Sequence, residues 1–222
     1  MKTLKRIVFW TLAIIVGYFA IGIFLSEVVF PIEKVDYSTY FLPGDRFISY
    51  SEGFHQTILA TNDGWVHLRL DAEPSAPGPP LHIHENFEET FYVNTGVLSI
   101  LVNGEKKVLN AGESFTVPRM TAHKPFNETT GTVVVVSDQD TKTMPAQFAY
   151  FLSQIYPLVD KFNGKPSPIS VIMQFAVWGS DTDSYLAEGP PVAVQKVMRV
   201  LLRPTARLLG YKYYYPEYKP QH

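Results

Sequence analysis

Between residues 45 and 138 one pattern dominates the sequence, in which short apolar segments alternate with turn-forming residues. In GWVHLRLDAE the apolar Val66, Leu68 and Leu70 alternate with polar neighbours, as expected for a strand with one buried face. Asn103-Gly104 divides VLSILVNGEKKVL, and this dipeptide is a strong signal for a tight hairpin. The proline- and glycine-rich segment EPSAPGPP is neither strand nor helix. Many short strands at close spacing predict an all-β sandwich or barrel.

The N-terminus predicts a membrane anchor. Residues 7–25 form an uncharged apolar run, which as a helix would be about 28 Å long and close to the thickness of a bilayer core. Lys2, Lys5 and Arg6 precede the run, so the positive-inside rule predicts a single-pass protein with a cytoplasmic N-terminus. Residues 1–26 are then a cytoplasmic stub and transmembrane helix, 27–44 a connector, and the rest extracytoplasmic (periplasmic or extracellular). The alternative is a cleaved signal peptide.

A mainly helical C-terminal extension is predicted for residues 141–222. MPAQFAYFLSQIYPLVDKF has helical spacing, whereas the apolar run SPISVIMQFAVWG fits a buried helix or a buried strand. The segment from Pro191 to Gly210 is predicted to be helical in two pieces divided at Pro204. The tyrosine-rich tail either wraps around the domain or lies at the lipid interface.

A basic stripe marks this last helical segment. Its members are spaced three to four residues apart on one helical face and are Lys196, Arg199, Arg203 and Arg207. One interpretation is an amphipathic helix on the membrane surface. The simpler one, which we expect here, is a helix that packs its leucines on the barrel and exposes its charges to solvent.

The composition of the chain argues against several classes of function. The formal net charge of −2 argues against a general nucleic-acid binder. The chain has no cysteine, which excludes disulfides, zinc-thiolate sites and a cysteine nucleophile.

Two histidines at positions 82 and 84 are the first indication of chemistry. On a strand, residues i and i+2 point to the same face, so His82 and His84 offer two imidazoles to one point. Such a pair alone is a weak metal signal. Three acids follow closely and compete as a further ligand, namely Glu85, Glu88 and Glu89.

The wider pattern has two parts separated by residues 97–111, which contain the hairpin. The first part consists of Gly78, His82, His84, Glu89 and Gly96, and the second of Gly112, Pro118, His123 and Asn127. This pattern resembles the two-part signature of the cupin superfamily over residues 78–127. The resemblance implies a double-stranded β-helix, or jelly-roll barrel, over residues 45–140.

The resemblance also implies the ligand set. His82, His84, Glu89 and His123 would be the metal ligands, and Glu89 could in addition act as a catalytic base. Three imidazoles and a carboxylate suit Fe, Mn, Ni, Cu, Co or Zn as divalent ions. Strand parity turns Glu85 and Glu88 away from the site, but Glu88 remains the alternative ligand if the loop runs differently.

Two positions depart from the family pattern. Met120 occupies a place where the second motif usually has glycine, which puts the turn before His123 in doubt. Gly78 stands four positions before His82 instead of the usual five, which changes the loop but not the ligands.

Further residues are candidates for a substrate pocket. The apolar ones are Phe91, Val93, Phe115 and Val117, and Asn127 is expected to be structural or to support the ligands. His67 and Arg69 share one face of a strand and would contact substrate if that face lines the cavity. The simpler alternative is an outward polar face with Val66, Leu68 and Leu70 inside.

The expected function is therefore a membrane-anchored cupin metalloprotein that acts on or binds a small organic molecule. An enzyme of this kind would be a metal-dependent oxygenase, such as a dioxygenase, or an isomerase. The alternative is a non-catalytic module that binds a metal or a metabolite on the outer face of the membrane. Single-domain cupins are often dimers, so a homodimer is expected unless the C-terminal extension covers the usual dimer surface.

Overall fold

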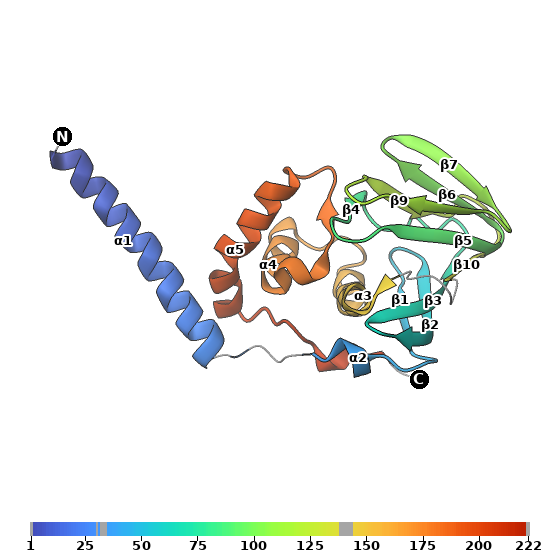
Figure 1. Cartoon of the computed structure of the whole chain (residues 1–222), viewed down its shortest axis with the longest axis horizontal. Coiled ribbons are helices and arrows are strands. Elements are labelled where there is room, and N and C mark those ends of the chain that lie inside the picture. Colours follow the sequence, from blue (N-terminus) through green and yellow to red (C-terminus); the bar gives the residue numbers. More distant parts are fainter. Residues whose placement is uncertain (1, 30, 32–34, 138–143, 221–222) are drawn as a thin grey trace.

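Two antiparallel sheets face each other, and helices from the C-terminal part of the chain cover one side of them (Figure 1). The structure is a computed structural model that describes residues 2–29, 31, 35–137 and 144–220. The sheets form a jelly-roll sandwich. The spacing of the apolar segments predicted a sandwich or barrel, and the family resemblance implied the jelly roll.

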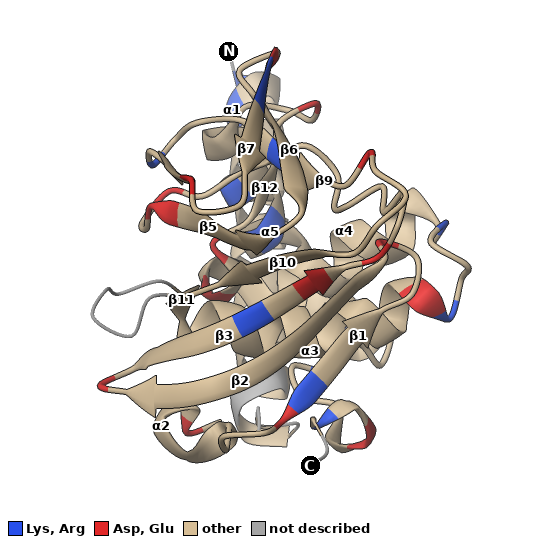
Figure 2. Cartoon of the chain, turned by 90° about the vertical axis from the view of Figure 1, so that its right-hand side faces the viewer, with Lys and Arg blue, Asp and Glu red and all other residues tan. Residues whose placement is uncertain are grey.

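The larger sheet has seven strands among the described residues. Its order is β1 (Arg46–Ser49), β2 (Phe54–Asn62), β3 (Trp65–Ala72), β10 (Val133–Val136), β5 (Glu89–Thr95) and β8 (Ser114–Val117). The short strand β11 (Met144–Pro145) pairs with β3 where that strand begins. The outward face of β1 to β3 carries a few separate charged residues (Figure 2).

The smaller sheet carries most of the metal-ligand candidates. Its order is β12 (Tyr185–Leu186), β4 (His82–Ile83), β9 (His123–Phe126), β6 (Val97–Val102) and β7 (Glu105–Asn110). The predicted hairpin at Asn103-Gly104 is confirmed, because it joins β6 to β7 and both residues have the positive φ angles, 48° and 86°, that such a tight turn requires.

The core lies between the two sheets and continues under the helices. Ile58, Val66, Val93 and Ile100 are each at most 1% exposed. Burial alternates along β2, as expected for a strand with one buried face. β3 departs from this rule, since Val66, His67 and Leu68 are all buried beside a register shift in the β2–β3 pairing.

Five α-helices are present in the described chain. They are α1 (Lys2–Phe24, continued by a π-helical turn over Leu25–Val29), α2 (Tyr37–Tyr40), α3 (Ala146–Asp160), α4 (Pro168–Trp178) and α5 (Val192–Leu208). Short 3-10 turns occur at Gly179–Thr182 and Pro216–Tyr218. By length and composition α1 is able to cross a membrane, a property that signal sequences share.

The structure decides between the alternatives for two segments of the extension. SPISVIMQFAVWG forms the helix α4, with Pro168 in its first turn and the Ser167 side chain accepting the backbone N–H of Ser170. The tyrosine-rich tail wraps around the domain, because Tyr213 is buried and its carbonyl accepts hydrogen bonds from Tyr150 and Trp178.

Two expectations about α5 are wrong. The helix is not divided at Pro204 but continues through it, because the proline removes only its own N–H donor and packs directly against α1 at Gly22. Its orientation also differs from the expectation. Arg199 is buried and Leu201 and Leu208 are exposed, while Leu202 packs against the core, so the helix neither exposes all its charges nor buries all its leucines.

Candidate metal centre

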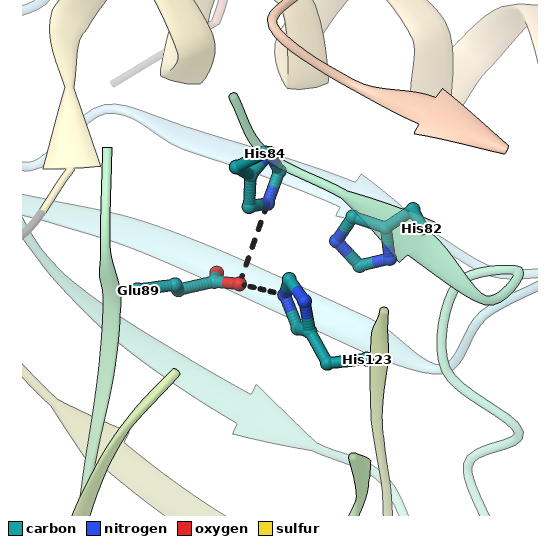
Figure 3. Close-up of side chains that lie close together, drawn as sticks. All are labelled: His82, His84, Glu89 and His123. Carbon is teal, nitrogen blue, oxygen red and sulfur yellow. Dashed lines mark hydrogen bonds and ion pairs between the residues drawn. The ribbon is translucent and has the colours of Figure 1, made fainter. Parts of the chain in front are cut away.

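Four side chains, three from strands and His84 from the residue after β4, converge at one point between the sheets (Figure 3). His82 lies on β4 directly opposite His123 on β9, and His84 follows two residues later on the same side. Glu89 is the first residue of β5 and enters from the larger sheet. The cluster therefore bridges both halves of the sandwich.

The four ligand atoms, one from each side chain, lie within 4.8 Å of one another. His123 Nε2 is 2.8 Å from Glu89 Oε2, and His84 Nε2 is 3.5 Å from the same oxygen. All three imidazoles are at most 8% exposed. Atoms bonded to one ion at about 2.1 Å lie about 3–4 Å from one another, so the cluster is compact enough to surround a single ion.

Each histidine is held through its other ring nitrogen. Each Nδ1 donates to a backbone carbonyl. The acceptor is Pro80 for His82 at 2.9 Å, Asp183 for His84 at 2.7 Å, and Thr121 for His123 at 2.9 Å. A carbonyl oxygen can only accept, so Nδ1 carries the proton in all three rings. In His82 and His84 the Nε2 lone pair is then directed at the cluster, which is the tautomer a metal requires. His123 Nε2 faces the Glu89 carboxylate at 2.8 Å and donates to it when the ring carries a second proton, which a bound metal would replace.

An unsatisfied buried atom gives a second test of fit. His84 Nε2 is buried and makes no hydrogen bond to any residue within the described ranges. Buried polar atoms without a hydrogen-bond partner are rare in proteins, and some of them are positions that bind an ion. Three convergent imidazoles and a carboxylate thus fit a divalent first-row ion.

Of the three acids that the sequence offers as a further ligand, only Glu89 reaches the cluster. Glu85 points away and forms an ion pair with Lys196 of α5 at 2.9 Å. Glu88 is exposed to solvent. Strand parity accounts for this, because Glu88 precedes the first residue of β5 and projects to its opposite face.

The pKa values of these side chains are shifted because the groups are buried close to one another. Burial, together with the neighbouring His84 and His123, lowers the pKa of His82 to about 3. Burial alone would raise the pKa of Glu89, but the hydrogen bond with His123 and the nearby His84 ring outweigh it and lower that pKa. Burial would likewise lower the pKa of His123, yet the hydrogen bond with Glu89 raises it. The cluster thus holds Glu89 as a carboxylate.

At both positions that depart from the family pattern, Met120 and Gly78, the backbone still forms the turn that the site needs. Met120 adopts the left-handed conformation with φ 59°, and its N–H donates to the carbonyl of His84 at 2.7 Å. The turn before His123 therefore forms without the usual glycine, at a cost of about 1–2 kcal/mol in backbone strain. Gly78 has φ 66°, and a Cβ there would lie 1.9 Å from the Pro125 carbonyl oxygen, so the shortened loop requires glycine.

Sequence reasoning missed Asp183. Besides the bond from His84 to its carbonyl, its carboxylate accepts the backbone N–H groups of Glu85 and Asn86 at 3.1 and 2.9 Å. Asp183 thereby fixes the loop that carries His84 into Glu89. It lies ninety-nine residues after His84, in a polar turn that follows α4, and nothing in its local sequence indicates this role.

A cavity of about 410 Å³ adjoins the cluster, and His82 and Glu89 form part of its wall. The sandwich contributes apolar side chains such as Leu68, Leu70 and Phe91. The rest of the apolar wall comes from α3 and α4 and includes Phe148, Phe151, Leu152, Ile155, Val171 and Phe175. Polar groups are few, the most buried being Glu52, Gln56 and the Tyr156 hydroxyl.

Among the predicted pocket residues, Phe91 lines this cavity. The structure places the others elsewhere. Val93 and Val117 are core residues beside the cavity, and the Phe115 ring lies beneath the Lys107 ammonium. Asn127 holds a turn, since its Nδ2 donates to the carbonyls of Glu73 and Gly131 at 2.7 and 2.8 Å.

The pair on β3 also lies outside the cavity wall. Arg69 is exposed and forms an ion pair with Asp71 at 2.6 Å on the outward face of the sheet. His67 is buried next to the pairing of β3 with β11. The register shift between β2 and β3 separates the environments of these two residues, which simple alternation would have placed on one face.

A two-sheet jelly roll with three imidazoles and one carboxylate gathered between its sheets defines a class of small β-sandwich proteins with a potential metal centre. The family model described as "Cupin domain" matches residues 68–137. This part of the chain is therefore a cupin domain. No curated protein matches the chain.

Several solved structures resemble the chain, and some of them are described as cupins. KdgF from a Halomonas species is 26% identical, covers 40% of this chain and 82% of its own, and gives a TM-score of 0.33. An RmlC-like cupin from Shewanella frigidimarina is 22% identical, with coverages of 44% and 86% and a TM-score of 0.35. A sugar phosphate isomerase from Silicibacter pomeroyi is 18% identical, with coverages of 48% and 76% and a TM-score of 0.37.

Proposed function

We propose that this chain is a membrane-anchored cupin enzyme that uses a divalent transition metal, held by His82, His84, Glu89 and His123, to oxidise or isomerise a small organic molecule. The observation that carries the proposal is the convergence of three Nε2 atoms and one carboxylate beside a largely apolar cavity. A metal bound there would supply Lewis acidity and, if redox-active, a place to activate dioxygen.

Other groups of the chain would orient the ligands, coordinate the metal and exclude water. Main-chain carbonyls hold each imidazole in one tautomer, so the ligands are oriented before a metal arrives. The lowered pKa of Glu89 favours its role as a ligand over that of a general base. Apolar side chains of α3 and α4 exclude water from the space beside the cluster.

The cavity suggests the class of molecule. Its volume lies in the range that proteins use for small organic ligands, and its wall is mostly aliphatic and aromatic. We therefore infer a ligand with an apolar body and few polar groups, one of which would face His82 and Glu89. Gln56 and Tyr156, which hydrogen-bond to each other at 2.8 Å, offer a second polar contact.

The proposed anchor is α1. Its side chains are largely exposed, as a helix in lipid requires, and only Gly22 is buried in it. Gly22 packs on Pro204 of α5, and the Tyr18 hydroxyl hydrogen-bonds at 2.8 Å with Leu201 and Thr205. Such contacts with the folded domain favour a retained anchor over a cleaved signal sequence.

Metal content tests the core of the proposal. Full-length protein purified in detergent should contain stoichiometric divalent metal by elemental analysis, and the His82→Ala/His84→Ala variant should lose it. His55→Ala is the matched control, because this histidine is partly exposed and pairs with Glu73 away from the cluster. A metal-free parent protein after metal supplementation would refute the proposed site.

Activity is tested separately. The metal-loaded protein is screened for oxygen uptake with catechols, flavonols and β-diketones, and for isomer formation by chromatography. Turnover that the double histidine variant lacks is the expected result. If the loaded protein turns over no compound and instead binds one tightly, the non-catalytic binding module becomes the correct assignment.

Topology is tested with a reporter that is active only outside the cytoplasm, fused after His222. An active fusion is expected from an N-terminus in the cytoplasm. An inactive fusion of a stably expressed protein would contradict the proposed orientation without affecting the metal site.

A further inference from the structure

α5 has an unusual distribution of side chains. Its outward residues are aliphatic and between 45% and 64% exposed: Val194, Val197, Val200, Leu201 and Leu208, followed by Leu209. A surface helix of a water-soluble domain normally turns its apolar stripe to the core and its polar face to solvent. α5 instead turns aliphatic side chains to the outside over most of its length, although Leu202 and Ala206 pack against the core.

The basic residues of the helix explain how this arrangement is held. Arg199 is buried, and its guanidinium donates to the carbonyls of Gly179 and Ser184 and to the Thr182 hydroxyl. The same guanidinium lies over the Tyr185 ring at 4.4 Å. Lys196, at the edge of the outward face, is directed to Glu85. The charges therefore fasten the inner face of α5 to the domain and leave an aliphatic surface outside.

The neighbour of this surface is α1. The two helices meet near the C-terminal end of α1, where Tyr18 hydrogen-bonds to Leu201 and Thr205 and Gly22 contacts Pro204 (Figure 1). From this junction the helices diverge, so the aliphatic face of α5 begins where α1 would leave a bilayer. A contiguous exposed apolar surface of this kind marks an interaction site.

We propose that the outward face of α5 lies in the interfacial layer of the same membrane that α1 crosses. This inference rests on the proposed anchoring by α1. Continuity with α1 selects lipid as the occupant, because a bilayer around the anchor would reach the adjoining turns of α5 first. Amphipathic helices bind membranes in this way, with the apolar face at the boundary between headgroups and acyl chains.

The chemistry of the face specifies the kind of contact. Arg199 is turned inward, Lys196 is paired, and Arg203 and Arg207 are half-buried with buried Nε atoms, so the face binds through apolar burial rather than through attraction to anionic lipid. The contact is therefore expected in neutral phosphatidylcholine and at high salt, unlike that of a polybasic surface helix.

The natural absence of cysteine allows a direct test on the full chain. Single variants Val197→Cys and Val200→Cys are labelled with nitrobenzoxadiazole and reconstituted in phosphatidylcholine nanodiscs that contain spin-labelled lipids. Ile14→Cys on α1 reports the anchor, and Glu105→Cys on β7 is the solvent control. Both α5 labels should lose most of their fluorescence to quenchers near the headgroups, Ile14 to quenchers deep in the bilayer, and Glu105 to neither.

The outcomes separate the two claims. If Ile14 is quenched and both α5 labels behave like Glu105, the anchor stands and the membrane contact of α5 is refuted. If Ile14 is also unquenched, the anchoring itself has failed. Efficient disulfide formation between Val200→Cys copies, without lipid quenching, would assign the face to a second copy of the chain and overturn the proposal. Unchanged quenching at high salt supports an apolar contact.

Discussion

At the residue scale, the candidate centre depends on main-chain carbonyls as much as on its four ligands. Each of the three histidines is fixed by a carbonyl, and two of these carbonyls are only two residues away in sequence. The third belongs to Asp183, whose carboxylate also holds the loop after His84. Groups that orient metal ligands typically contribute 10–100-fold to metal affinity, by order of magnitude.

We predict that Asp183→Gly lowers metal affinity by about 10–100-fold, as measured by competition with a chromogenic chelator. Glycine keeps the left-handed backbone of this position, φ 38°, and removes only the carboxylate. Glu85→Gln is the control, since it loses a solvent-exposed ion pair on the same loop. Equal affinities of Asp183→Gly and the parent would show that the carboxylate does not position His84.

A second buried residue carries a pH dependence. Burial, with Asp160 nearby, raises the pKa of Glu52 to about 8 against 4.5 ordinarily, and Lys124 offsets this only in part. Between these two values the folded state holds a proton that the unfolded state has lost, so stability falls as pH rises and levels off above about 8.

Glu52→Gln should remove this penalty. The variant should gain stability relative to the parent as pH rises from 5 to 9, by about 2–4 kcal/mol in total, judged from about 1.4 kcal/mol for each pKa unit. Urea denaturation at both pH values measures the difference, with the exposed Glu88→Gln as reference. A constant difference between Glu52→Gln and the parent at both pH values would contradict a neutral Glu52.

The residues of the centre show what a sequence can predict. The cupin resemblance implied His82, His84, Glu89 and His123 as a set, strand parity agreed for the two histidines and for Glu89, and the structure brings these four together. Asp183 was out of reach because its contacts span about a hundred residues and use backbone atoms. Simple alternation placed Arg69 on the outward face, as found, but it put His67 there too, and His67 is buried beside a register shift that leaves no trace in the pattern of residue types.

At the element scale, α5 connects to the centre through Lys196, which pairs with Glu85 on the ligand loop, and through the buried Arg199. The guanidinium of Arg199 satisfies three oxygen acceptors in residues 179–184, the segment that presents Asp183 to the ligand loop. Burial lowers the pKa of Arg199 to about 10, so it remains charged at neutral pH. The helix and the loop therefore form one packed unit.

Arg199→Met should destabilise the protein by about 3 kcal/mol or more, because each acceptor left unsatisfied in the interior costs about 1–3 kcal/mol. Lys196→Met, one turn earlier on the same helix, should cost less than about 1 kcal/mol, as for other exposed ion pairs. Denaturation followed by tryptophan fluorescence compares them. Similar losses for both variants would mean that Arg199 is not the link between α5 and the loop.

Elements with a clear turn signal or a regular spacing of apolar residues could be predicted from the sequence. Elements without either could not. The hairpin of β6 and β7 follows from its turn residues, but strands β11 and β12 have two residues each and show no alternation. The apolar run of α4 fits either a helix or a strand in sequence. The direction in which α5 faces depends on Arg199 finding acceptors in another segment, which a helical wheel does not show.

At the scale of the whole molecule, the sandwich and the C-terminal extension share one cavity. Leu152 of α3 lines it, whereas Leu158 on the same helix is half-buried outside it. Leu152→Trp should fill part of this space and weaken binding of the neutral fluorophore N-phenyl-1-naphthylamine by at least about tenfold, since overpacking an apolar interior costs about 1–3 kcal/mol. Fluorescence titration gives the affinity.

Leu158→Trp is the matched control and should leave the affinity for this fluorophore unchanged. Metal content should be the same in both variants, because neither residue contacts the cluster. Equal weakening by the two substitutions, or none by Leu152→Trp, would show that the fluorophore binds elsewhere and that the cavity is not the ligand site.

The bond between His84 and Asp183 also has a consequence for biogenesis. The chain is made from its N-terminus, and domains begin to fold in that order. The strands that carry all four ligand candidates are complete by residue 126, yet the carbonyl that fixes His84 is synthesised only at residue 183. The centre therefore acquires its final geometry late in synthesis, and a nascent chain stalled before this point would present three imidazoles of which only two are oriented.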